Sequence, residues 1–269
     1  MARSAILNVM FQAASKAGRV LTRDFGEIEQ LQVSRKGPAD FVTAADKRSE
    51  EIIHRELEKA RPGYGFLLEE SGAIEGTDNQ HRWIVDPLDG TTNFMHGVPI
   101  FGISIALERQ GQLTAALVYN PVMDELYTAE RGAGAYLNDR RLRVAQRSRL
   151  SDCLFATGMP FLGHGDAGQT LREIAPIMGA TSGLRRCGAA AIDLCWVAAG
   201  RFDGFWERNL SPWDIAAGAL MVREAGGFIS DADGGDRILE TGSVVAGNEF
   251  THGHMLKMLK STAVGDRPA

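Results

Sequence analysis

The sequence contains little cysteine. Its three cysteines, Cys153, Cys187 and Cys195, are odd in number and follow no zinc or thiol-redox spacing. The pattern therefore indicates neither a disulfide framework nor a structural zinc site. We expect small buried side chains in a reducing compartment, and hence a cytoplasmic protein.

Long apolar runs and an excess of basic charge are also missing. No run approaches the roughly 18 apolar residues that a membrane span needs. Apolar residues near the start, from Ile6 to Phe25, recur every three or four positions, which predicts a helix and not a signal peptide. Lys and Arg number 29 against 34 Asp and Glu, a net charge of −5, so we expect neither a membrane nor nucleic acid as the main partner.

The apolar periodicity predicts a layered α/β fold with an antiparallel meander in the first half and a mixed sheet in the second. Residues 1–145 and 146–269 form two halves of one compact unit, since no linker divides them. Residues 27–42 are predicted to be a loop and 261–269 a frayed tail. The expected helices are 6–25, one from the Thr43 cap to Arg61, 167–178, 189–199, 212–225 and 249–260. The expected strands are 65–68, 83–85, 101–107, 113–119, 125–129, 134–137, 154–157, 202–206, 227–230 and 243–246.

The stretch from Asp86 to Phe94, DPLDGTTNF, is the most informative in the chain. It follows the apolar run 83–85, and Pro87 cannot continue a strand ladder, so Asp86 and Asp89 can face one point. Two carboxylates about 4 Å apart repel by roughly 1 kcal/mol in water and about 4 kcal/mol near a protein surface. A fold that joins them needs a proton or a cation, and oxygen-only ligands favour Mg²⁺, Mn²⁺ or Ca²⁺. The alternative is a solvated turn.

Two more acids occupy comparable positions. Glu69 follows the predicted strand 65–68, and ligands in α/β sheets collect beyond the carboxyl ends of strands. Ser211 suits a helix N-cap and Pro212 the first helical position, which puts Asp214 at the third. Asp214 could instead serve only to complete a capping box.

Together these segments resemble the inositol monophosphatase family of lithium-sensitive, magnesium-dependent phosphatases. The resemblance covers roughly residues 5–260, and the tract from Arg185 to Gly188 looks like the bacterial branch. It implies the αβαβα sandwich shared with fructose bisphosphatases. The matching segments are Glu69-Glu70-Ser71, Trp83 to Phe94, Pro212 to Gly218, and Glu224 to Gly227.

The resemblance also implies the metal ligands. Two Mg²⁺ ions are expected, with a weaker third near Glu69 and with Mn²⁺ as a possible substitute. The first ion would be held by Glu69, Asp86 and the carbonyl of Leu88, and the second by Asp86, Asp89 and Asp214. Glu70 would contribute through water.

The remaining implied roles concern water, phosphate and leaving group. Thr91, paired with Asp46, would orient the attacking water together with Glu69. The implied phosphate contacts are Gly90, Thr91 and Thr92, and the implied substrate contacts are Glu207, Gly188, Ala189 and Ala190. Ala189 and Ser211 stand where some relatives carry Thr and His, so the leaving-group contacts differ from theirs.

The implied reaction is hydrolysis of inositol monophosphate, a small phosphorylated polyol, by metal-activated water attacking in line, without a covalent intermediate. Lithium is expected to inhibit through the second ion's position. Histidinol phosphate, fructose 1,6-bisphosphate and a 3′-phosphonucleotide are alternative substrates. Thr92-Asn93-Phe94 favours the inositol branch over nucleotide phosphatases, which tend to carry a basic residue at the position of Thr92.

The resemblance further implies a homodimer and, for some bacterial relatives, a binding role with the transcription machinery. The arginines at 140–149 and 185–186 are the local features that could serve it. If an Asp89→Asn protein loses phosphatase activity yet retains a specific partner in pull-down, that binding role gains support. Loss of both properties would contradict a separate binding role, and a monomeric mass in light scattering would contradict the dimer.

Overall fold

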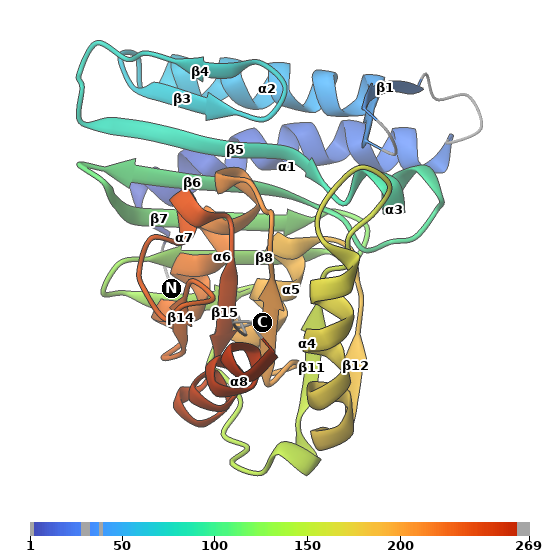
Figure 1. Cartoon of the computed structure of the whole chain (residues 1–269). Coiled ribbons are helices and arrows are strands. Elements are labelled where there is room, and N and C mark those ends of the chain that lie inside the picture. Colours follow the sequence, from blue (N-terminus) through green and yellow to red (C-terminus); the bar gives the residue numbers. More distant parts are fainter. Residues whose placement is uncertain (1–2, 28–32, 38–39, 263–269) are drawn as a thin grey trace.

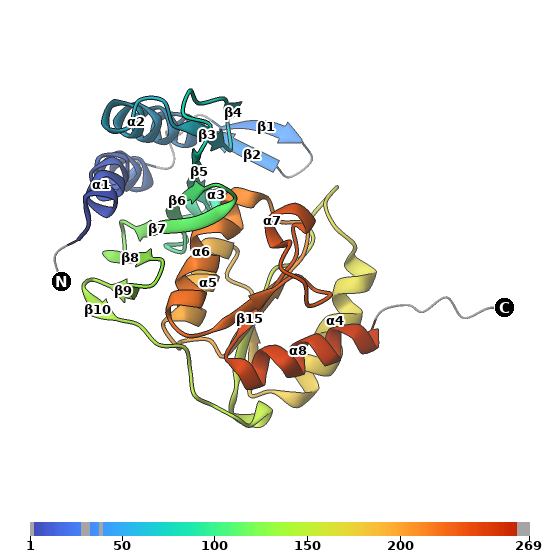
Figure 2. The same cartoon turned by 90° about the vertical axis from the view of Figure 1, so that its left-hand side faces the viewer.

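The computed structural model describes residues 3–27, 33–37 and 40–262. Helices and sheets alternate in layers, helix, sheet, helix, sheet, helix (Figure 1), and the same succession runs across Figure 2. The predicted layered α/β fold is confirmed, with a largely antiparallel first sheet and a mixed second sheet.

The first sheet has eight strands in the order β10-β9-β8-β7-β6-β5-β3-β4. Neighbours from β5 to β10 are antiparallel, whereas β3 runs parallel to β5. The turn between β6 and β7 has positive φ at Gln110 (51°) and Gly111 (75°), as tight hairpins require. The strands are β3 (Gly65–Leu68), β4 (Gly72–Ile74), β5 (His81–Asp89), β6 (Gly102–Arg109), β7 (Gln112–Asn120), β8 (Glu125–Glu130), β9 (Gly134–Leu137) and β10 (Arg140–Arg141).

The second sheet has five strands in the order β12-β11-β13-β15-β14. Strand β11 lies parallel to both neighbours, and β15 is antiparallel to both of its own. The carboxyl ends of β11 and β13 therefore meet at one edge of the sheet. The strands are β11 (Leu154–Thr157), β12 (Gly183–Arg185), β13 (Gly204–Glu207), β14 (Phe228–Ser230) and β15 (Val244–Gly247).

The helices fill three layers. Helices α1 (Ala5–Gly26) and α2 (Ala44–Ala60) cover the outer face of the first sheet, and α4 (Ala167–Ala180) packs beside α8 (Glu249–Thr262) on the second. Helices α5 (Ala190–Ala198) and α6 (Pro212–Glu224) lie between the sheets and are apolar on almost every side, as a helix with two buried faces must be. Two short helices are α3 (Thr91–Met95) and α7 (Ile238–Thr241). None of the helices in the described ranges combines the length and apolar composition that a bilayer span requires.

Some predicted boundaries are wrong. Within the predicted loop 27–42, residues Val33–Gly37 (β1) and Asp40–Thr43 (β2) pair as antiparallel strands. Helix α8 extends to Thr262, into the predicted tail, and residues 263–269 lie outside the described residues. Strands of two to five residues carry too few alternations to be read from sequence, because backbone pairing with their neighbours decides them.

Close packing of α5 against α6 fixes the middle layer. A Cβ on Gly218 would lie 2.5 Å from Cβ of Leu194, which is closer than carbon atoms can approach. Gly218 stands about one turn after Asp214, so this contact also sets the position of the acidic end of α6. A side chain at 218 would force the two helices apart.

We predict that Gly218→Ala lowers the free energy of unfolding by about 1–3 kcal/mol, the usual cost of overpacking a core. The matched control is Gly253→Ala in α8, where nothing lies within 4 Å of the added Cβ. That change should be neutral or should stabilise by up to about 1 kcal/mol through helix propensity. Urea unfolding of both variants measures the difference, and equal stabilities would contradict the close-packing argument.

Candidate metal and phosphate site

Three acids from two elements converge beside the middle layer. Asp86 and Asp89 end β5, and Asp214 lies in the first turn of α6. One carboxylate oxygen from each lies within 4.8 Å of the others. Asp86 and Asp89 are buried, and Asp214 is half-buried. The structure thus brings these three predicted residues together.

A bulge in β5 brings the first two acids to the same side. Asp86 pairs with Ser104, and Asp89 pairs with Gly102. The chain therefore advances three residues on β5 while it advances two on β6. In a regular strand, residues three apart point to opposite faces. The extra residue reverses that alternation, as bulges near functional sites often do.

Backbone N–H groups hold each carboxylate in place. Leu88 N–H donates to Asp86 Oδ1 (2.8 Å), and Ser211 N–H donates to Asp214 Oδ2 (2.7 Å). Ala191 N–H, at the start of α5, donates to Asp89 Oδ2 (2.8 Å). The middle helix α5 is thus tied directly to the acidic cluster, a contact that the sequence analysis missed.

The cluster is electrostatically costly without a cation. Burial, and then the negative charge of Glu69, raises the pKa of Asp86 well above its usual range, and Glu69 also hydrogen-bonds Asp86. Burial and the charge of Asp214 likewise raise the pKa of Asp89. These oxygens favour a proton or a divalent cation, and an oxygen-only set suits Mg²⁺, Mn²⁺ or Ca²⁺. The residues present therefore fit a hard metal ion.

A hydroxyl–carboxylate pair, formed by the half-buried Thr91 and the buried Asp46, lies next to the cluster. Thr91 Oγ1 lies 2.9 Å from Asp46 Oδ1, to which it donates, and 3.1 Å from the Leu88 carbonyl oxygen. Asp46 Oδ2 accepts from Thr43 N–H (2.8 Å), which completes the predicted capping box of α2. Burial raises the pKa of Asp46, although its hydrogen bonds oppose the shift.

The short helix α3 begins beside these residues. Its N-cap, Gly90, has φ of 90°, and a Cβ there would lie 2.9 Å from the Ile100 carbonyl oxygen and 3.2 Å from Cβ of Ala189. Asn93 Nδ2 donates to the carbonyl oxygens of Ile100 (2.7 Å) and Cys187 (2.8 Å). Asn93, to which the sequence motif assigned no contact of its own, thereby joins α3 to the segment that leads into α5.

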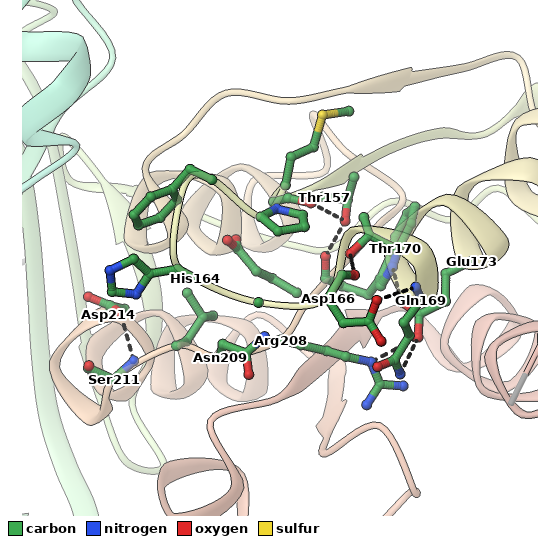
Figure 3. Close-up of a pocket in the computed structure, with 18 of the residues that line it drawn as sticks. Thr157, His164, Asp166, Gln169, Thr170, Glu173, Arg208, Asn209, Ser211 and Asp214 are labelled. Atoms are coloured by element: carbon green, nitrogen blue, oxygen red, sulfur yellow. Dashed lines mark hydrogen bonds and ion pairs between the residues drawn. The ribbon is translucent and has the colours of Figure 1, made fainter. Parts of the chain in front are cut away.

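A cavity of about 390 Å³ extends from the cluster between β13 and α4 (Figure 3). Glu69, Asp214 and Ser211 line it, as does Glu207. Burial, followed by the charges of Asp193 and Asp214, raises the pKa of Glu207 well above its usual value. The cavity can therefore accept a polar molecule that extends away from the three acids.

Three residues predicted from the sequence as substrate contacts lie outside this cavity. Gly188, Ala189 and Ala190 do not line this cavity; Gly188 has φ of 83°, and all three precede the Ala191 N–H that contacts Asp89. Ala189 lies beside Gly90, since a Cβ on Gly90 would come within 3.2 Å of Cβ of Ala189.

Glu70 and Thr92 are placed by backbone contacts. Glu70 N–H donates to Glu50 Oε2 (2.8 Å), and Ser71 Oγ donates to Glu50 Oε1 (2.5 Å). Glu50 is buried on α2 and fixes the loop that carries Glu69, a role that no sequence signal indicated. Thr92 is exposed in the first turn of α3, and its carbonyl oxygen accepts a hydrogen bond from His96 N–H (3.2 Å).

Comparisons with known proteins agree with this geometry. The profile described as "Inositol monophosphatase family" matches residues 2–263. The chain is 65% identical over 260 residues to an "Inositol-1-monophosphatase" of Mesorhizobium japonicum, covering 97% of this chain and 98% of the relative. It is 44% identical over 243 residues to the "Nus factor SuhB" of Escherichia coli K12, covering 90% and 91%.

A solved structure shows the same fold. The crystal structure of the extragenic suppressor protein suhB from Bartonella henselae superposes with a TM-score of 0.93 at 60% identity, covering 96% of this chain and 99% of that one. The chain belongs to the inositol monophosphatase family.

Proposed function

We propose that this chain is a Mg²⁺-dependent phosphomonoesterase that hydrolyses inositol monophosphate. The observation that carries the proposal is the meeting of Asp86, Asp89 and Asp214 within 4.8 Å, next to a polar cavity. The relatives named inositol-1-monophosphatase, at 52–65% identity, support the choice of substrate.

In this proposal the acids and one carbonyl hold the metal ions. Glu69, Asp86 and the Leu88 carbonyl would hold one, and Asp86, Asp89 and Asp214 the second, with a third, weaker ion near Glu69. Bound Mg²⁺ would lower the pKa of water and neutralise phosphate charge. Mn²⁺ has the same preference for oxygen ligands and would substitute.

The chain's own residues would position the reactants. Thr91, oriented by its hydrogen bond to Asp46, and Glu69 would align the attacking water. The backbone N–H groups of Gly90, Thr91 and Thr92, at the start of α3, would donate to phosphate oxygens. Because the phosphate would lie over the acids, the leaving group would extend into the cavity toward Glu207, and Gly188, Ala189 and Ala190 would border the phosphate side.

Several other properties expected from the sequence remain predictions. Relatives at 44–46% identity named Nus factor SuhB favour a second role with the transcription machinery. The homodimer, lithium inhibition, water-mediated support from Glu70 and a cytoplasmic location remain predictions.

The decisive test is phosphate release from myo-inositol 1-phosphate, histidinol phosphate, fructose 1,6-bisphosphate and a 3′-phosphonucleotide. We expect the inositol ester to turn over fastest with Mg²⁺, EDTA to abolish turnover and Li⁺ to inhibit it. Asp89→Asn should lower turnover by about 10²–10³-fold, the usual loss when one charge-stabilising group is removed. The exposed Asp124→Asn is the matched control and should retain activity.

Each outcome has a distinct meaning. Full activity in EDTA would contradict the metal mechanism. Metal-dependent turnover that favours another ester would retain the site and change the substrate.

We also predict how the acidic cluster couples stability to pH. Where a carboxyl pKa is raised in the folded state, the folded chain binds more protons than the unfolded chain. The contribution of Asp86 and Asp89 to stability should therefore fall as pH rises above the ordinary carboxyl range in metal-free protein. Mg²⁺ should offset the loss, so its stabilisation should be greater at pH 8 than at pH 5, with about 2.7 kcal/mol expected at 100 times the Kd.

Urea unfolding with EDTA or Mg²⁺ measures this coupling. Asp89→Asn keeps an oxygen to accept the Ala191 N–H while it removes one like charge. The variant should be more stable than the wild type in EDTA at pH 8 and should gain less from Mg²⁺, whereas Asp124→Asn should behave as the wild type does. An equal gain from Mg²⁺ in all three proteins would contradict a metal site at Asp89.

A further inference from the structure

The outer wall of the cavity is a hairpin that no feature of the sequence marked as functional. It comprises residues 158–166 and connects β11 to α4. His164 N–H donates to the Phe161 carbonyl oxygen (2.8 Å), which closes a tight turn, and the two residues form an isolated antiparallel bridge. Gly163 and Gly165, with φ of 86° and 77°, flank His164 and allow the chain to reverse.

The hairpin fits closely against the end of β13 and the segment that follows it. A Cβ on Gly158 would lie 1.7 Å from Glu207 Oε1, so a larger residue there would displace the glutamate. A Cβ on Gly165 would lie 3.2 Å from Asn209 Nδ2 and 3.0 Å from Cβ of Pro160. The first end of the hairpin thus lies against Glu207 and the other end against Asn209, two residues further on, which places the residues between them at the cavity.

His164 is the basic side chain of this hairpin. It lines the cavity at the same end as Asp214 and Ser211 (Figure 3). Its ring packs on that of Phe161, with centroids 4.6 Å apart and planes inclined by 32°. The aromatic contact supports the imidazole from one side.

Within the described residues, the ring nitrogens of His164 have no hydrogen-bond partner. A ring nitrogen contacts an oxygen in four of the other histidines: His81, His96, His252 and His254. The ring of His54 instead packs edge-on against Phe66, and His164 is exposed at the cavity. A neutral imidazole offers one donor and one acceptor. At the cavity those two groups are available to a bound molecule.

We infer that His164 hydrogen-bonds the hydroxyls of a polyol leaving group and is a specificity-determining residue of this chain. The inference rests on the proposed function. Glu207 ends β13 and His164 lies on the hairpin, and both line the cavity, so one ligand there would meet the two from different elements. A ring that carries hydroxyls on successive carbons can bond to both, whereas an aromatic leaving group without hydroxyls can bond to neither.

The test compares two phosphomonoesters in the full-length protein with Mg²⁺. Myo-inositol 1-phosphate has a polyol leaving group, and p-nitrophenyl phosphate has a flat one without hydroxyls. For the inositol ester, His164→Ala should raise KM about threefold to tenfold, the effect of losing one neutral hydrogen bond, with kcat within about twofold. For the nitrophenyl ester both constants should stay within about twofold of the wild type, because no such bond is lost.

Two further variants distinguish the loss of a hydrogen bond to the substrate from a structural change in the hairpin. His164→Gln keeps a donor and an acceptor and should recover most of the lost affinity for the inositol ester. Leu162→Ala changes a side chain that is 74% exposed in the same turn, and it should leave all constants unchanged. Thermal midpoints of the three variants should match the wild type.

The outcomes distinguish this inference from the function on which it rests. An unchanged KM in His164→Ala, or an equal rise for both esters, would overturn the contact and leave the phosphatase proposal standing. A wild-type protein that hydrolyses the nitrophenyl ester but not the inositol ester would overturn the polyol substrate and the contact together. Inactivity on both esters would overturn the proposed function itself.

Discussion

The mutual repulsion of Asp86, Asp89 and Asp214 is the constraint on which the rest of the structure depends. Buried carboxylates this close oppose folding unless a cation or protons offset their charge. The fold holds the three carboxylates with backbone N–H donors at Leu88, Ala191 and Ser211. These donors fix the carboxylates in place but do not neutralise their charge. Those donors come from β5, from the start of α5 and from the residue before α6, so the geometry of the site requires that the first sheet and the middle layer are assembled.

The packing of the middle layer supplies the energy for this arrangement. Helices α5 and α6 bury most of their residues between the sheets, and the absence of a side chain at Gly218 lets them approach closely. Burial of apolar surface on two faces stabilises a helix more than burial on one. Apolar packing along these helices can therefore offset the electrostatic cost at their first turns, which explains why the acids lie there rather than at an edge of the fold.

Much of this fold can be predicted from the sequence, because periodic apolar residues indicate the long helices and strands. The Ser211 cap and the Thr43 capping box also follow local rules and were predicted. The bulge between Asp86 and Asp89 was not, since it depends on the register with β6. Glu50, Asn93 and the hairpin 158–166 were missed for a related reason: each acts on residues far away in the chain, and no local pattern records such a contact.

The two sides of the site are built differently, and this difference bears on how one chemistry can serve several substrates. The acids are bound to backbone groups of strands and helix termini, so a change there disturbs the fold as well as the site. The cavity wall is a glycine-rich hairpin whose exposed side chains Phe161 and Leu162 contribute little to the core. Side chains such as His164 can change there without moving Asp86 or Asp214. Selection for a new leaving group would therefore act on the hairpin, while the acidic cluster stays as the fold requires.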